Sequence, residues 1–268
     1  MKIINLPPPP KRLKIRGITI RGERHSGTGF LRQLITKNCP EMTSEITCEE
    51  YRGDLDTSCE KRSPWLQNLD IDEKYGWKHS VLNSEKILDP EDLLIAIFRN
   101  YTTWLPKMRK ETYERVPKKN IPMHDFLRSN WLPDFKPAGK ESDKMLDTQQ
   151  WQNVFQMRTT KYSKWLEYTK MYPLSSLSVK YEELASNSTK FLKSLLDEYD
   201  MPCKPFDEWD PVNCHAKYGR CLGRTVGEKK MVTGGGKYTD EDYNWKSEDW
   251  EFALANLDKD LERKIGYL

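Results

Sequence analysis

The sequence predicts an α/β fold in which three layers, α/β/α, are built around a central and mainly parallel sheet. Residues 92–98, DLLIAIF, form the most apolar run of the chain and follow Pro90. A run of this length without polar alternation is typical of a parallel strand that is buried on both faces. Strand-like segments also alternate with segments of helical apolar spacing, which is the pattern of an α/β domain. No internal repeat is visible, so we expect one domain over residues 1–268.

The first predicted unit is a strand, a glycine-rich turn and a helix. Ile15, Ile18 and Ile20 indicate a short buried strand. Residues 22–29, GERHSGTG, follow as a turn, and helical apolar spacing begins near Thr28. Backbone N–H groups converge where such a turn enters a helix, and the helix dipole favours an anion there. The unit predicts a cradle for a phosphate or sulfate group; the alternative is a tight turn whose glycines are incidental.

The turn differs from the phosphate-binding loop of nucleoside triphosphatases at one position. Gly22 and Gly27 keep the G-x-x-x-x-G spacing, but Thr28 stands where that motif requires Lys. Without this Lys, no side chain of the motif reaches the β- and γ-phosphates of a nucleotide. Ordinary ATP hydrolysis is therefore not expected.

Three segments have little periodic pattern. Residues 1–13 contain four consecutive prolines and predict a stiff arm. Residues 39–75 and 118–150 are polar and interrupted by proline and glycine, and we expect them to be mostly irregular. Their position makes them candidates for a lid or for acceptor-facing segments. A short helix is expected within the last of them, at residues 124–129.

The remaining elements follow from apolar spacing. Helices are expected at 100–117, interrupted near a proline, and at 148–171, where an aromatic stripe indicates core packing more than a ligand pocket. A strand at 174–181 and a helix at 188–199 follow. The rest of the chain predicts a loop-rich stretch at 203–237 and one final amphipathic helix near 250–265.

Charge and cysteine content exclude several classes of function. Lys+Arg 44 against Asp+Glu 41 gives a net charge of +3, which is no footprint for nucleic acid. No apolar run approaches the ~20 residues that span a bilayer, and the first residues lack the apolar segment of a signal peptide. The six cysteines show no C-x-x-C pair and no metal spacing, so we expect free thiols, a reducing cytoplasmic location and no bound metal. Asn100 and Asn187 begin N-x-[ST] triplets, which are common by chance.

The chain contains four short motifs in this order: RHSGT at 24–28, KHS at 78–80, Arg99-Asn100 with Lys107, and VKYEEL at 179–184. Together they resemble the family of sulfotransferases that use 3′-phosphoadenosine 5′-phosphosulfate (PAPS). Residues 24–28, RHSGT, resemble the 5′-phosphosulfate loop, and residues 78–80, KHS, resemble the Lys/His segment ahead of the central strand. Arg99-Asn100 with Lys107 resembles the 3′-phosphate motif, and residues 179–184, VKYEEL, resemble a later strand end of the family. The order and distances agree over about residues 15–200. The resemblance implies a sulfotransferase fold related to that of P-loop nucleoside triphosphatases.

The resemblance also implies which residues contact PAPS. Three positions depart from the family pattern: His25 replaces the usual Lys, Tyr101 the usual Pro, and Lys107 the usual Ser. Positive charge is kept at the first and last of these positions. The C-terminal basic loop of the family has its nearest candidate in residues 224–230, RTVGEKK. The residues that the resemblance assigns to the donor are Arg24, His25, Ser26, Gly27, Thr28, Gly29, Phe30, Arg99, Lys107, Arg224, Lys229 and Lys230.

The implied reaction is an in-line transfer of a sulfuryl group to a hydroxyl or amine, and it leaves adenosine 3′,5′-bisphosphate. Positioning and electrostatic stabilisation dominate such transfers, and no metal is required. His79 is the candidate base, because the reference pKa of a histidine, near 6.5, suits proton removal at neutral pH. Lys78, Arg24 and His25 are candidates for stabilising the transferred charge. The alternatives are a structural role for His79 and a surface salt bridge for Arg99.

Two other functions remain open from the sequence. One is a small-molecule or nucleotide kinase that uses the same cradle, although Thr28 argues against it. The other is a non-catalytic nucleotide-binding module. For the sulfotransferase, a small-molecule acceptor is the expected partner, without nucleic acid or membrane.

Overall fold

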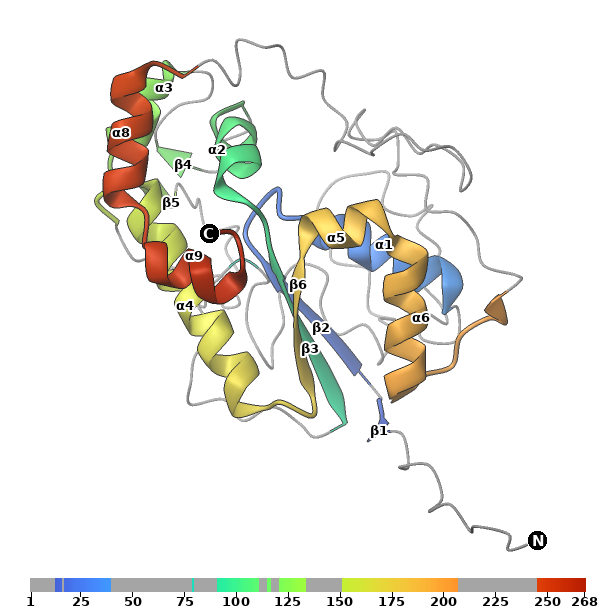
Figure 1. The fold of residues 1–268 in the computed structure, drawn as a ribbon. Coiled ribbons are helices and arrows are strands. Elements are labelled where there is room, and N and C mark those ends of the chain that lie inside the picture. Colours follow the sequence, from blue (N-terminus) through green and yellow to red (C-terminus); the bar gives the residue numbers. More distant parts are fainter. Residues whose placement is uncertain are drawn as a thin grey trace, which may run out of the picture.

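The structure is a computed structural model of the chain (Figure 1). It describes residues 13–15, 17–39, 79, 91–110, 115–116, 121–133, 151–206 and 245–268. Predictions for residues 1–12 and for most of 40–90 lie outside this part of the chain, and so do those for Lys78, Arg224, Lys229 and Lys230.

A parallel sheet of three strands forms the centre of the described structure. Its order is β2 (Gly17–Gly22), β3 (Asp92–Phe98) and β6 (Ser176–Lys180). The register pairs Gly22 with Ile97 and Phe98 with Lys180, so the carboxyl ends of all three strands lie together. A short parallel pair joins β1 (Leu13–Lys14) to β7 (Tyr199–Asp200). The predicted α/β class with a mainly parallel sheet is confirmed for this part of the chain.

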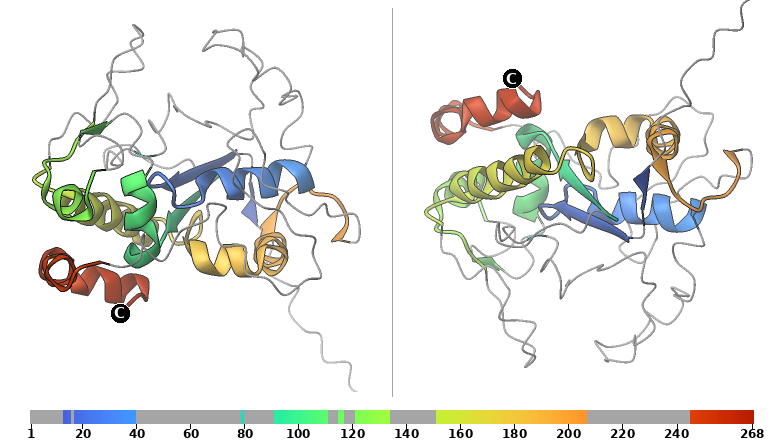
Figure 2. Two further views of the ribbon diagram at one scale, coloured as in Figure 1. Left: turned by 90° about the horizontal axis from the view of Figure 1, so that it is seen from above. Right: turned by 90° about the horizontal axis from the view of Figure 1, so that it is seen from below.

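Helices cover both faces of the sheet, and β3 shows why. Its side chains alternate between two apolar clusters: Leu93, Ile95 and Ile97 lie in one, and Leu94, Ala96 and Phe98 lie in the other. All seven residues of β3 are therefore buried, as the apolar run predicts. Figures 1 and 2 show the sheet lying between the two groups of helices.

The helices that the structure describes form two groups, one on each side of the sheet. The first group is α1 (Thr28–Asn38), α5 (Tyr181–Ser186) and α6 (Ser188–Glu198). The second group includes α4 (Val154–Met171) and α9 (Lys259–Ile265), whose apolar residues pack against β3. A third apolar cluster joins residues of α2 (Tyr101–Lys110), α3 (Met123–Arg128) and α8 (Ser247–Asn256) to the start of α4.

Several predicted boundaries were wrong, each for a local reason. The single final helix is two helices, because Asp258 accepts a hydrogen bond from the backbone N–H of Leu261 and starts α9 anew. The helix predicted from 148 begins at Val154, where the Asn153 side chain caps it. Pro106 lies inside α2 without interrupting the helix, which ends at Lys110. Residues 115–116 (β4) then pair antiparallel with residues 132–133 (β5).

The described part of the segment 118–150 packs into the core. Phe126, Leu127 and Trp131 are almost completely buried in the cluster that also contains Trp104. The helix predicted at 124–129 is confirmed as α3. This part therefore contributes to stability, and the acceptor-facing role predicted for the segment is untested for its other residues.

A disulfide joins Cys39 to Cys203 across 164 residues. Cys39 follows α1 and Cys203 follows β7, and the backbone N–H of Lys204 donates to the carbonyl of Asn38 beside the bond. The prediction of free thiols was wrong for these two cysteines. Cysteine spacing in the sequence could not reveal this disulfide, because only the folded structure brings the residue after α1 and the segment after β7 together. The predicted cytoplasmic location, which was inferred from free thiols, loses that support.

In the described part of the chain, no helix is both long and apolar enough to cross a membrane.

Candidate functional site

The turn between β2 and α1 takes two left-handed backbone conformations in quick succession. His25 has φ of 63° and Gly27 has φ of 98°, and the backbone N–H of Ser26 donates to the carbonyl of Glu23 at 3.0 Å. Gly27 is the N-cap of α1. The chain thus reverses tightly and sets the amino end of α1 against the carboxyl end of β2. This is the edge at which open parallel sheets bind their ligands.

Two of the three glycines in this turn are required by packing. A Cβ atom on Gly22 would lie 2.4 Å from the Ser26 hydroxyl, and one on Gly27 would lie 2.3 Å from the ring of Tyr181. Gly27 also has a φ that other residues avoid. A Cβ on Gly29 would meet no atom within 4 Å. Hence Gly22 and Gly27 are not incidental, whereas Gly29 leaves open space at the helix start.

The turn presents several hydrogen-bond donors. The first N–H groups of α1 have no intrahelical partner, no side chain caps them, and no acidic residue lies in the first helical turn. The Ser26 side chain is completely buried, and its hydroxyl has no hydrogen-bond partner among the described residues. Thr28 is 7% exposed and adds a second hydroxyl. A buried donor without a partner costs about 1–3 kcal/mol, so a bound anion would relieve that cost.

Glu23, within the turn, forms a buried ion pair. Glu23 accepts from Lys161 Nζ at 2.8 Å through one carboxylate oxygen and from the Arg24 backbone N–H at 2.8 Å through the other. Both charged side chains are nearly inaccessible to solvent. This pair was not predicted from the sequence. Its only signal is the place of Lys161 within the apolar aromatic stripe of α4, where a charge requires a partner.

Arg99 lies at the carboxyl end of β3 and contacts the turn directly. Its Nη1 donates to the His25 carbonyl at 2.6 Å, its Nε donates to Thr103, and its guanidinium stacks on the Tyr181 ring at 4.5 Å. The side chain is 6% exposed, and none of the described residues accepts a hydrogen bond from its Nη2. The structure therefore brings Arg99 to residues 24–29, as the parallel sheet predicts. It is no surface salt bridge.

Arg99 itself is held by a second buried ion pair. Arg158 donates from Nε to Glu262 at 2.7 Å and from Nη2 to the Arg99 carbonyl at 2.8 Å. Tyr162 accepts from the Arg99 backbone N–H, and burial raises the pKa of Tyr162 to about 12. These three residues come from α4 and α9. The two helices thereby fix the backbone at the end of β3.

Glu182, at the start of α5, links the residues that follow β3 to the C-terminal residues. It accepts from the Asn100 backbone N–H at 3.0 Å and from the Tyr267 hydroxyl at 2.7 Å. Burial, followed by this hydrogen bond, raises the pKa of Tyr267, which stays protonated. Glu182 lies in the first turn of α5. Its link to Asn100 and to the C-terminal residues was not predictable from local sequence.

His79 lies at the end of β2, next to the turn. Its side chain is 4% exposed, and its Nδ1 is 2.5 Å from the Gly22 carbonyl oxygen. Because a carbonyl only accepts, Nδ1 carries the proton and the imidazole lone pair is on Nε2. An imidazole in this tautomer is a proton acceptor at Nε2. The structure thus brings a histidine to the predicted anion cradle from 57 residues away.

The other residues predicted to bind PAPS lie at different distances from the turn. Arg24 and His25 form the turn itself, and their carbonyls accept from Trp104 and Arg99. Phe30 lies in the first turn of α1 and is partly buried against the core. Lys107 lies in the last turn of α2, about 9 Å along the helix from its start at Tyr101. The role predicted for Lys107 stays a prediction.

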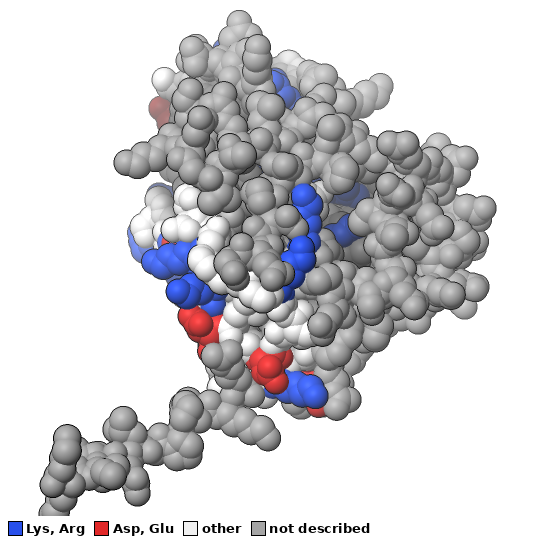
Figure 3. Space-filling model, turned by 90° about the vertical axis from the view of Figure 1, so that its right-hand side faces the viewer, with Lys and Arg blue, Asp and Glu red and all other residues white. Residues whose placement is uncertain are grey.

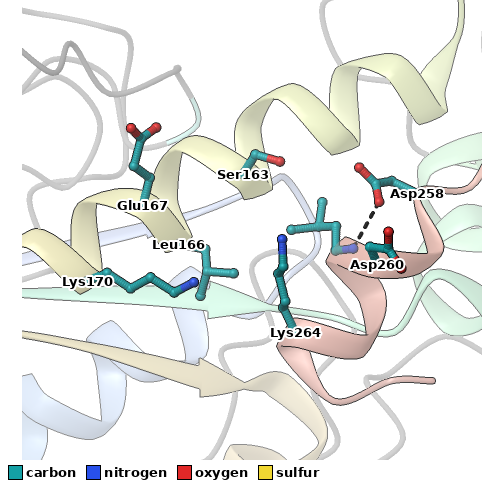
Figure 4. A pocket seen from close by; sticks show the side chains of 8 residues that line it. Ser163, Leu166, Glu167, Lys170, Asp258, Asp260 and Lys264 are labelled. Carbon is teal, nitrogen blue, oxygen red and sulfur yellow. Dashed lines mark hydrogen bonds between the residues drawn. The ribbon is translucent and has the colours of Figure 1, made fainter.

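Two further features lie away from the turn. His124, Glu248 and Asp249 bring three possible metal ligands within 4.8 Å of one another, but Asp249 also pairs with the Arg128 guanidinium at 2.8 Å, whose charge opposes a cation. A pocket of about 390 Å³ lies between α4 and α9 (Figure 4). Its side chains mix both charge signs, and none of the predicted site residues lines it.

The side of the molecule that holds α1 and α6 also mixes charges. Exposed residues of α6 include Lys190 and Lys193 but also Asp197 and Glu198. Figure 3 shows this side, with described Lys and Arg side chains over its middle and most of the described Asp and Glu side chains below them. The described part of this face therefore has no stripe of a single charge sign.

Neither a protein-family model, nor a curated protein, nor a solved structure matches this chain.

Proposed function

We propose that the protein is a PAPS-dependent sulfotransferase that transfers a sulfuryl group to a hydroxyl or amine of a small-molecule acceptor. The observation that supports this best is the buried Ser26 hydroxyl, which has no hydrogen-bond partner among the described residues and lies in the turn that Arg99 and His79 contact. The four family-like motifs of the sequence include these residues in the same order. An anion cradle beside a proton acceptor is the minimum that the transfer requires.

The turn would bind the 5′-phosphosulfate of the donor. The N–H groups of residues 27–30 and the hydroxyls of Ser26 and Thr28 are the donors there. Thr28 replaces the lysine that a nucleoside triphosphate requires, so a shorter phosphosulfate fits the chemistry better. Gly29 leaves room for the anion beside the first helical turn. The Glu23 carboxylate does not oppose the anion, because Lys161 neutralises it.

Arg99 would contact the 3′-phosphate through Nη2 while Nη1 keeps the turn in place. A guanidinium held rigidly by a backbone carbonyl and an aromatic ring loses little entropy when it binds a phosphate. Lys107 is the second candidate for that phosphate. Arg24 and His25 would stabilise negative charge on the bridging oxygen as adenosine 3′,5′-bisphosphate leaves.

His79 would act as the base. Its Nε2 takes the proton from the acceptor hydroxyl or amine while the acceptor atom forms a bond to sulfur. The bond from sulfur to the bridging oxygen breaks, and its electron pair leaves with the bisphosphate. The hydrogen bond to the Gly22 carbonyl fixes the required tautomer and couples the base to the cradle. General base catalysis of this kind contributes about 10²–10⁴-fold.

Two measurements test the proposal. Calorimetry with adenosine 3′,5′-bisphosphate should show binding that Ser26→Ala weakens, and the absence of binding at high micromolar concentration would refute the proposal. Transfer of ³⁵S from labelled PAPS to phenolic, alcoholic and amine acceptors should fall about 10²–10⁴-fold in His79→Ala, with bisphosphate affinity retained.

His124→Ala is the matched control, because this histidine is exposed on α3 beside α8 and should leave the transfer rate unchanged. Turnover of ATP with Mg²⁺ and no use of PAPS would instead identify a kinase. Binding of the bisphosphate without any transfer would identify a nucleotide-binding module.

A further inference from the structure

We propose that Asn187 carries an N-linked glycan and that the chain therefore folds in an oxidising, glycosylating compartment. The glycan would come from an oligosaccharide linked to a lipid pyrophosphate. In the transfer, a bond forms between Asn187 Nδ2 and C1 of the first sugar, and the bond between C1 and the pyrophosphate oxygen breaks. One Nδ2 proton leaves to a base of the transferase, and the lipid pyrophosphate departs. This inference is independent of the sulfotransferase proposal.

The Cys39–Cys203 disulfide is the first observation behind it. Both cysteines that the structure describes are joined in this bond, and Cys39 is completely buried. Disulfides of this structural kind persist in oxidising compartments and are rare where thiols are kept reduced. In the secretory route such compartments are also where Asn-x-Ser/Thr triplets are modified.

The geometry at Asn187 is the second observation. Asn187 is exposed in the junction between α5 and α6 and begins the triplet Asn-Ser-Thr. Its side-chain oxygen caps α6 by accepting from the Lys190 backbone N–H at 3.1 Å. Since the oxygen faces the helix, the amide nitrogen on the other side of the same carbon faces away. A glycan on that nitrogen keeps the oxygen and hence the cap.

The second triplet of the chain, at Asn100, is unsuited to a glycan. Asn100 is only partly exposed, and its side-chain oxygen accepts from the Thr102 backbone N–H and hydroxyl at 2.9 and 2.8 Å. Its backbone N–H donates to Glu182, and it directly follows Arg99. A glycan here would lie at the carboxyl end of β3, over the candidate site. We therefore assign the modification to Asn187 alone of these two.

The distance from the candidate site also fits. Tyr181, which contacts the turn at Gly27, begins α5, and Asn187 follows the end of that helix. One helix of six residues, about 9 Å long, thus separates the two positions. A glycan that points outward from Asn187 would leave the turn open.

The test uses the full chain purified from its natural source. Treatment with an amidase that removes N-glycans in H₂¹⁸O, followed by peptide mass spectrometry, should convert Asn187 to ¹⁸O-labelled Asp and leave Asn100 unchanged. Alkylation before and after reduction should label Cys39 and Cys203 only after reduction. An unmodified Asn187, a glycan on Asn100, or labelling of both cysteines without reduction would each overturn the proposal.

Three variants, expressed in cells of the natural source, distinguish loss of the glycan from loss of the helix cap. Thr189→Ala destroys the triplet but keeps the Asn187 cap, so it should remove the whole mobility shift caused by the glycan. Ser188→Ala changes the central position and should keep that shift. Asn100→Gln should keep it as well. A shift that survives Thr189→Ala would refute the assignment.

Discussion

Replacement of Gly27 by alanine tests the geometry of the turn directly. Gly27 has φ of 98°, and the left-handed conformation costs an L-residue roughly 1–2 kcal/mol. The new Cβ would also lie 2.3 and 2.7 Å from two ring carbons of Tyr181, closer than any stable contact. Either the turn or the ring must move.

Movement of the ring has its own cost. Tyr181 stacks against the Arg99 guanidinium at 4.5 Å, and such a cation–π contact contributes about 0.5–2 kcal/mol. Together with the backbone term, Gly27→Ala should lower the free energy of unfolding by about 2–4 kcal/mol. Because Arg99 also holds the His25 carbonyl, the variant should bind adenosine 3′,5′-bisphosphate more weakly.

Urea denaturation measures the free energy, and two variants calibrate it. Gly29→Ala places a Cβ in open space on the first turn of α1 and should be neutral or stabilise the fold by up to about 1 kcal/mol. Tyr181→Ala combined with Gly27→Ala removes the ring contact but keeps the backbone cost, so the double variant should lose less than the sum of the two single changes. If Gly27→Ala and Gly29→Ala have the same stability, the described turn is wrong.

Three other changes have calculable effects on stability. Arg158→Met leaves the Glu262 carboxylate buried without its partner and should cost about 3–5 kcal/mol in urea denaturation, whereas an unchanged midpoint would contradict the buried ion pair. Burial raises the pKa of Tyr162 from 10.0 to about 12, so the unfolded chain loses that proton at a lower pH than the folded chain. Between pH 10 and pH 12 the contribution of Tyr162 to the free energy of unfolding should therefore fall by about 3 kcal/mol, and Tyr162→Phe should make the measured fall shallower. The double replacement of Cys39 and Cys203 by alanine opens a loop of 164 residues and should lower the free energy of unfolding by about 5 kcal/mol through loop entropy; an unchanged urea midpoint would contradict the disulfide.

Elements that depend on residues close together in the sequence could be predicted from the sequence alone. The apolar run of β3 predicts burial on both faces, because strand side chains alternate between the faces and the six residues after Asp92 are all apolar. The glycines at 22 and 27 predict the turn. A Cβ atom on Gly22 would clash with Ser26, and one on Gly27, which has a left-handed φ, would clash with Tyr181. The apolar stripe of α4 predicts a helix and its core face, although not its first residue.

Helix ends depended on single side chains that periodicity does not reveal. The apolar spacing continues from α8 into α9, yet the chain breaks where Asp258 caps the new helix. Pro106 was expected to interrupt α2 and is instead accommodated within it. In both places the choice between continuing and ending a helix involves only a few kcal/mol, which tertiary packing can outweigh.

Tertiary structure alone decided how the candidate site is assembled. The sequence predicts Arg24–Phe30, His79 and Arg99 as site residues. Parallel strands that end at one edge bring Arg99 to the turn, and His79 contacts the Gly22 carbonyl at the end of β2. The sequence did not reveal that the partner of Lys161 is Glu23, 138 residues away, or that Cys39 bonds to Cys203. Periodicity reports which face of an element is buried, whereas the partner of a buried charge or thiol depends on which elements pack together. The turn between β2 and α1 was therefore predictable from local sequence, and the contacts that support it were determined only by the fold.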